Sequence, residues 1–221
     1  MSMTTFQSGG GIYKITVYPP PADGRRYPIL VFVHGNAGLG GQFGAQIHAF
    51  AKRTAAEGYC TAVPQYYVDD EPHLMDAMPK DDVLADAIDA LNVLPDVDVA
   101  RMGLVGFSLG AATVMEYVAK RQPGAVSVLA DFFGFLTPSI RSAASRFPPT
   151  VIFHNRHDRI VDAQHSRELD QLLGSVDHGL SEYDEQYLGV NHSFSPGGAA
   201  DLDSQAKTIS WCEKYLPPVG S

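Results

Sequence analysis

Strand-like and helix-like patterns of apolar residues alternate along most of the chain. Buried strands show as short apolar runs, and helices as apolar residues spaced three and four apart. The pattern predicts strands at residues 11–18, 29–35, 59–67, 101–107, 125–134, 150–155 and 181–188. It predicts helices at residues 42–57, 81–94, 108–120, 163–173 and 201–215. This alternation indicates an α/β fold with a mostly parallel central sheet and helices on both faces.

The length of 221 residues suits one domain spanning residues 1–221. In a parallel sheet of this kind, ligand-binding groups collect at the carboxyl ends of the strands. Catalytic or ligand-binding residues are therefore expected where the apolar runs end.

One such run ends in the sequence GFSLG at residues 106–110. A strand that passes directly into a helix through a very tight turn lifts the central serine clear of the sheet, which is the arrangement called a nucleophile elbow. Gly106 and Gly110 stand where a side chain would collide with the neighbouring strand or helix. Ser108 is therefore the predicted nucleophile.

A serine hydroxyl needs a histidine as general base and a carboxylate that orients this histidine. Hydrolases with such an elbow carry them in the chain order serine, acid, histidine. His192 follows the last predicted strand and is the expected base. Asp158, just after the strand at 150–155, is favoured as the acid over Asp131, which ends the preceding strand.

The negative charge that forms on the substrate oxygen needs backbone amide donors. The amide of Leu109, at the start of the helix, is one expected donor. The second is expected from the loop after the strand at 29–35, where either Asn36 or Ala37 supplies the amide.

With these segments placed, the chain resembles the dienelactone hydrolase family of α/β-hydrolases. The resemblance covers nearly the whole chain, without a large lid domain. It is carried by the HG loop at 34–38, VPQYY at 63–67, VGFSLGA at 105–111, DFFGF at 131–135, FHNRHDRIVD at 153–162 and NHSF at 191–194. It implies an α/β-hydrolase fold, with Ser108, Asp158 and His192 as the triad and Leu109 at the oxyanion position.

The chain also departs from the family. The founding type has a cysteine where this chain has Ser108, so a serine esterase mechanism is expected. That type binds its substrate's carboxylate with arginines near the tyrosine pair and after the HSF segment, and this chain has no arginine in PQYYVDD or HSFSPGG. A dienelactone substrate is therefore not expected. The expected substrate site is instead apolar, formed by Tyr66, Tyr67, Phe107, Phe133 and Phe194.

The expected reaction is hydrolysis of a small carboxylic ester or lactone through an acyl-enzyme, without a cofactor. A thioesterase or an acyltransferase would use the same triad. A non-catalytic binding protein on the same fold is a third hypothesis. A metal site at His154, His157 and Asp158 is a further alternative, although two histidines at a strand end do not easily face one ion.

The composition of the chain excludes some classes of binding partner. The net charge is −9, with 25 acidic against 16 basic residues, which argues against nucleic acid or an anionic membrane as partner. The first residues lack a charged segment followed by an apolar one, and the two cysteines form no disulfide framework, so a cytoplasmic location is expected. We expect a small ester, lactone or thioester as the substrate, and a monomer or homodimer.

Overall fold

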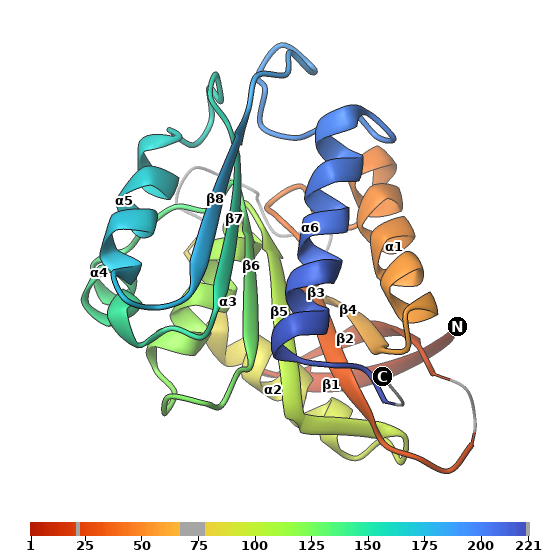
Figure 1. Ribbon diagram of the computed structural model, residues 1–221. Helices are drawn as coiled ribbons and strands as arrows, with labels where there is room; N and C mark the ends of the chain where they lie inside the picture. The colour runs from red at the N-terminus through yellow and green to blue at the C-terminus, as the bar shows by residue number, and fades with distance from the viewer. Residues whose placement is uncertain (21–22, 67–77, 220–221) are drawn as a thin grey trace.

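A computed structural model describes residues 1–20, 23–66 and 78–219. In this part of the chain, eight strands form one sheet in the order β1-β2-β4-β3-β5-β6-β7-β8 (Figure 1). The first two strands and the β2–β4 pair are antiparallel, and all later neighbours are parallel. The strands are β1 (Ser2–Ser8), β2 (Gly11–Tyr18), β3 (Tyr27–Val33), β4 (Cys60–Gln65), β5 (Val97–Phe107), β6 (Val128–Phe132), β7 (Thr150–Asn155) and β8 (His178–Tyr183).

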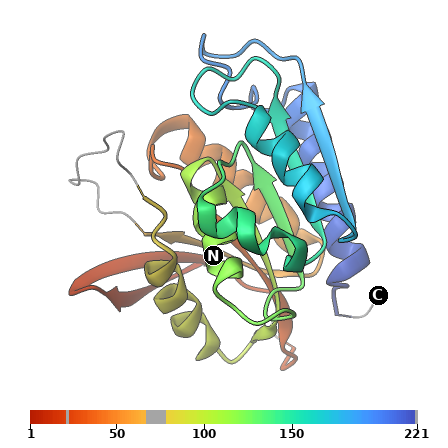
Figure 2. The same ribbon diagram turned by 90° about the vertical axis from the view of Figure 1, so that its left-hand side faces the viewer.

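Helices cover both faces of the sheet, as the alternating pattern predicts. The helices α1 (Gly41–Ala56) and α6 (Ala199–Tyr215) lie side by side on one face (Figure 1). The opposite face is covered by α2 (Asp81–Asn92), α3 (Leu109–Ala119), α4 (Pro138–Ala143), the short 3-10 turn Ala144–Arg146 and α5 (Gln164–Leu173) (Figure 2). No large lid domain is inserted within the described residues.

Two apolar clusters fill the space between the sheet and these helix layers. The central strands are buried on both faces, as every residue of β3 shows, which explains why they read as continuous apolar runs. The amphipathic helix α2 buries Val83, Leu84, Ala87, Ile88 and Leu91 at helical spacing.

The structure corrects three expectations from the sequence: a missed strand, a strand boundary and a missed helix. The N-terminal strand β1 was not expected; it is an edge strand with mostly exposed, polar residues and gives little apolar signal. The last strand, β8, runs over His178–Tyr183 rather than 181–188. The linker after β6 holds the helix α4, whose first turn has Thr137 as N-cap and Pro138 in its first positions.

The parallel strands bring five loops to one end of the sheet. Residues 34–38 follow β3, Ser108 follows β5, Phe133 follows β6, Asp158 follows β7 and His192 lies between β8 and α6. Because these strands run in the same direction, their carboxyl ends meet at one edge. The fold therefore gathers the candidate catalytic side chains.

Candidate active site

Ser108 lies in a strained turn between β5 and α3. Its backbone has φ 55° and ψ −119°, a conformation that non-glycine residues rarely adopt and that occurs at functional sites. A Cβ at Gly110 would lie 2.1 Å from the Val33 carbonyl oxygen, and one at Gly106 would lie 2.4 Å from the Ala111 Cα. Both glycines are therefore required for the close packing of the turn, as the motif predicts.

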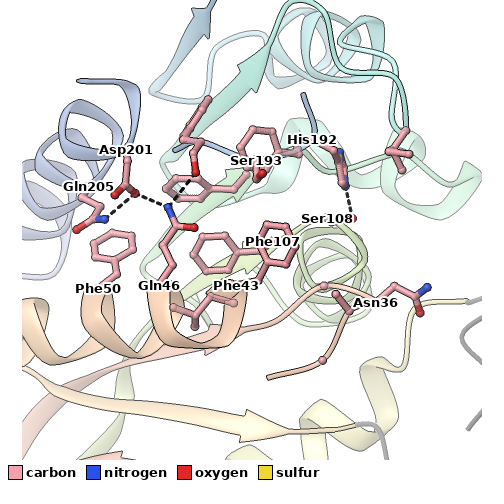
Figure 3. Close-up of a pocket in the computed structure, with 18 residues that line it drawn as sticks. Asn36, Phe43, Gln46, Phe50, Phe107, Ser108, His192, Ser193, Asp201 and Gln205 are labelled. Carbon is pink, nitrogen blue, oxygen red and sulfur yellow. Dashed lines mark hydrogen bonds between the residues drawn. The ribbon is translucent and has the colours of Figure 1, made fainter. Parts of the chain in front are cut away.

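A continuous chain of hydrogen bonds joins the three predicted catalytic side chains. The Ser108 hydroxyl lies 2.7 Å from His192 Nε2, and His192 Nδ1 lies 2.6 Å from Asp158 Oδ2. Because an ionised carboxylate only accepts hydrogen bonds, Nδ1 carries the proton and Nε2 is left to accept from Ser108. Figure 3 shows the His192 ring pointing at Ser108 from the loop above it.

The carboxylate of Asp158 is held by several donors. Its side chain is completely buried, and its Oδ1 accepts from the backbone amides of Ile160 and Val161 at 2.8 and 3.0 Å. Burial alone would raise the pKa of Asp158. The hydrogen bonds from His154 and His192 outweigh it and lower this pKa to about 2. Asp158 is therefore ionised at neutral pH.

His154, which the sequence suggested only as a metal ligand, lies next to Asp158. Its buried imidazole places Nε2 3.2 Å from Asp158 Oδ2 and 3.0 Å from the Val161 carbonyl oxygen. Both neighbours accept, so Nε2 carries the proton, and Nδ1 accepts from the Ser166 hydroxyl at 2.6 Å. One carboxylate oxygen of Asp158 is thus shared by two imidazoles.

The competing acid, Asp131, lies in a different environment. It is buried beneath the loop after β6, where its Oδ1 accepts from the Gly134 amide at 2.9 Å. Burial raises the pKa of Asp131 to about 6, and the nearby His154 side chain and the hydrogen bond from the Gly134 amide only partly oppose this. The carboxylate that contacts His192 is that of Asp158.

Two backbone segments that could supply amide donors adjoin Ser108. Leu109 is the first residue of α3, and the first amides of a helix have no partner within the helix. On the other side, Gly38 N donates to Gly35 O, which closes a turn with Asn36 and Ala37 at its centre. A Cβ at Gly35 would lie 3.1 Å from the Ser108 Cβ, so this loop packs directly on Ser108.

The Ser108 hydroxyl opens into a cavity of about 190 Å³. Six phenylalanines are among its lining residues, which come mainly from the loop at 34–38, α1, the ends of β5 and β6, the loop that carries His192, and the start of α6 (Figure 3). Of the expected substrate-site residues, Phe107, Phe133 and Phe194 line the cavity. Phe133 has a φ of 59°, and its ring lies 5.6 Å from the His192 ring, centroid to centroid.

Neither of the two tyrosines expected at the site is found among the described residues of the cavity lining. Tyr66 is completely buried outside the cavity lining, and its hydroxyl donates to the His34 carbonyl oxygen at 2.8 Å. It braces the loop that carries Asn36 and Ala37. Tyr67 lies outside the described residues.

Several lining residues were not expected from the sequence. They lie on the two helices that pack side by side on one face of the sheet, and they are Phe43, Gln46, Ile47 and Phe50 on α1, and Asp201 and Gln205 on α6. The spacing of three and four on α1 was a signal that this face is buried. The pair of polar residues four apart on the buried face of α6 was a second signal.

The histidines of the HNRHD segment do not face one another. His154 is buried against Asp158, whereas the His157 side chain is 58% exposed and pairs with Asp184. Within the described residues, no group of three or more histidine, cysteine, aspartate or glutamate side chains could hold a metal ion.

The sequence model of the dienelactone hydrolase family matches residues 15–215. The chain belongs to the dienelactone hydrolase family. As a member of this family it is a carboxylic ester hydrolase. A search of curated protein sequences found no significant match.

Solved structures show the same fold as this family member. A protein described as a dienelactone hydrolase from Klebsiella pneumoniae is 19% identical, with a TM-score of 0.76 over 97% of this chain and 98% of that one. An esterase from Thermogutta terrifontis with bound propionate is 15% identical, with a TM-score of 0.74 over 100% and 96%. An esterase domain from Rhodothermus marinus is 14% identical, with a TM-score of 0.75 over 97% and 99%. At such identities the likeness concerns the fold.

In the part of this chain that the structure describes, no helix is long and apolar enough to cross a membrane.

Proposed function

We propose that this chain hydrolyses small carboxylic esters or lactones through a Ser108–His192–Asp158 triad and an acyl-enzyme intermediate. The observation that carries this proposal is the hydrogen-bond chain from the Ser108 hydroxyl to Asp158, because it ends at a cavity with room for a substrate. A serine in contact with a correctly oriented histidine is activated for nucleophilic attack.

The first half of the reaction acylates the serine. His192 Nε2 takes the proton of the Ser108 hydroxyl while Oγ bonds to the substrate carbonyl carbon. The electron pair of the carbonyl moves onto its oxygen. When this tetrahedral intermediate collapses, the bond to the leaving alkoxide breaks and His192 gives it the proton. Asp158, ionised and buried, stabilises the imidazolium that forms in between.

The second half releases the acid. A water molecule loses a proton to His192 Nε2 and attacks the acyl carbon, and the Ser108 Oγ leaves with the proton returned by His192. In both halves the oxyanion accepts from the amide of Leu109 and from an amide of the 34–38 loop. We favour Asn36 over Ala37 for this second donor, because its N–H belongs to the peptide that adjoins Gly35, which packs on Ser108.

The cavity favours a small, apolar substrate. Its volume of about 190 Å³ lies below the range of roughly 300–1,000 Å³ that holds drug-sized ligands. Phe107, Phe133 and Phe194 present apolar surface beside the reacting serine. Burial of an apolar acyl or alcohol group against these rings provides the binding free energy.

Intact-mass measurement after treatment with a fluorophosphonate tests the proposed nucleophile. We expect one phosphonyl adduct on the native chain and none on Ser108→Ala. Ser127→Ala, a change outside the active site, is the control and keeps the adduct. The steady-state hydrolysis of 4-nitrophenyl acetate should fall by at least 1,000-fold in Ser108→Ala and in His192→Ala, as for other triads.

Two results contradict the proposal. One is a folded native chain without an adduct or turnover. The other is a Ser108→Ala variant that is labelled as fast as the native chain.

A further inference from the structure

The cavity has a polar wall opposite the catalytic serine. Figure 3 shows Gln46 and Asp201 on the far side of the phenylalanine rings from Ser108 and His192. Gln46 belongs to α1, whereas Asp201 and Gln205 belong to the first turns of α6. The triad mechanism does not use these three residues, although all of them line the cavity.

Hydrogen bonds fix the orientation of the Gln46 amide. Its Nε2 lies 2.8 Å from Asp201 Oδ1 and 3.3 Å from the Phe194 carbonyl oxygen. Both neighbours can only accept, so the nitrogen must be on that side and the oxygen on the other. The Oε1 of Gln46 is therefore turned away from α6 and toward the cavity interior, as Figure 3 shows. It presents an acceptor to whatever fills the cavity.

Asp201 adds a carboxyl group to this wall. Its Oδ1 accepts from Gln46 and from Gln205 Nε2, which is 2.8 Å away, and its Oδ2 accepts from the Gly197 amide at 2.7 Å. The residue is only 6% exposed. All these donors are neutral, and its place in the first turn of α6 supplies the partial positive charge of a helix N-terminus. None of these contacts brings a lysine or arginine side chain to the carboxylate.

Cations are missing from the rest of the lining. Within the described residues, the cavity lining contains neither lysine nor arginine. A substrate carboxylate at the far wall would meet the oxygens of Gln46 and Asp201, and it would lose its hydration without gaining a cationic partner.

We propose that this wall is a binding subsite for a hydrogen-bond donor, and that the enzyme prefers esters whose apolar arm ends in a hydroxyl or an amino group. The inference rests on the proposed function, since it concerns the substrate of the same serine. The apolar arm lies among the phenylalanines, and its terminal donor reaches Gln46 Oε1. A site that offers a buried acceptor disfavours an analogue without the donor, because the acceptor is then left without a partner.

Two matched series of esters test the inference. In the first, the acyl arm varies: 4-nitrophenyl esters of 3-phenylpropanoate carry a hydroxyl, aminomethyl, methyl or carboxylate group at the ring's 4-position. In the second, the same four groups stand on the alcohol arm of 2-phenylethyl acetate. In at least one series we expect kcat/KM to be about tenfold higher for the hydroxyl and aminomethyl esters than for the methyl ester. The carboxylate ester of that series should be the slowest.

The variant Gln46→Met removes the acceptor while keeping the length of the side chain. We expect the ratio of hydroxyl to methyl kcat/KM to fall to about one in this variant. Gln42→Met, one turn earlier on α1 and exposed outside the cavity lining, is the matched control and keeps the ratio of the native chain.

The design separates failure of this inference from failure of the proposed function. Turnover of 4-nitrophenyl acetate and fluorophosphonate labelling of Ser108 report the function alone. If both are present and the four esters react within twofold of one another in both series, the donor subsite is refuted while the hydrolase stands. A preference for the carboxylate ester, or an unchanged ratio in Gln46→Met, also refutes it.

Discussion

Gly110→Ala is the sharpest test of how the fold positions the nucleophile. A Cβ at this position would lie 2.1 Å from the Val33 carbonyl oxygen and 2.4 Å from the His34 carbonyl oxygen, where ordinary contact begins at 3.4 Å. The elbow must therefore move by about 1.3 Å relative to β3. Both neighbours are backbone atoms, so no side-chain rotation can relieve the clash.

Two magnitudes follow from this displacement. Overpacking of a close-packed interior costs about 1–3 kcal/mol of unfolding free energy. The same shift moves Ser108 relative to His192 and to the oxyanion amides, and a misplacement of about 1 Å costs on the order of 100-fold in rate. We therefore expect kcat/KM to fall by about 100-fold. The loss of stability does not explain such a fall as long as the variant stays folded, because the amount of folded enzyme then hardly changes.

The assay combines hydrolysis of 4-nitrophenyl acetate with urea denaturation. Gly179→Ala is the matched control, because a Cβ on Gly179 in β8 meets nothing within 4 Å, and both quantities should stay near native values. If Gly110→Ala keeps kcat/KM within threefold and its unfolding free energy within about 0.5 kcal/mol of native, the close approach is not what positions Ser108.

Three further predictions concern Asp158 and two buried groups near it, His154 and Asp131. His154→Phe should lower the unfolding free energy by about 2 kcal/mol, because the Ser166 hydroxyl and the Val161 carbonyl lose a buried partner, and urea denaturation measures this. Since the pKa of Asp158 falls from 3.8 to about 2 on folding, its contribution of about 2 kcal/mol is complete above pH 3.8 and is lost as the pH falls toward 2. Thermal melting against pH should show this acid limb in the native chain and a weaker one in Asp158→Asn. The pKa of Asp131 is raised from 3.8 to about 6, so stability should decline as the pH rises through that interval, and Asp131→Asn should remove the decline. A flat profile in the native chain over either interval would contradict the corresponding assignment.

The sequence located the candidate catalytic residues wherever a reactive side chain follows the end of a buried strand. The apolar runs of β3, β5, β6 and β7 are short and continuous, so their ends could be located within a few residues. Because parallel strands share a carboxyl edge, Ser108, Asp158 and His192 could be assigned to one site without knowledge of distances. The choice between Asp158 and Asp131 depended on loop geometry, which no periodicity reports.

Other features left little local signal. The edge strand β1 is short and mostly polar, so the strand pattern is faint there. The helix α4 did have one readable signal, a threonine N-cap followed by proline at Thr137 and Pro138, which suits a helix start. The expected role of Tyr66 in substrate binding shows a different limit. An aromatic residue next to an active-site loop can brace it from behind, and only packing tells the two roles apart.

The sequence could not show that Gln46 and Asp201 meet in one wall of the cavity, and the reason is physical. Gln46 and Asp201 are 155 residues apart and meet only because α1 and α6 pack side by side on one face of the sheet. The catalytic end of the cavity is built from strand ends and a strained turn, where the backbone tolerates few changes. The far end is built from helix side chains, which can change without moving a strand. Selectivity for the substrate can therefore differ between proteins that share the triad, and the substrate of this chain has to be deduced from its helices as well as from its elbow.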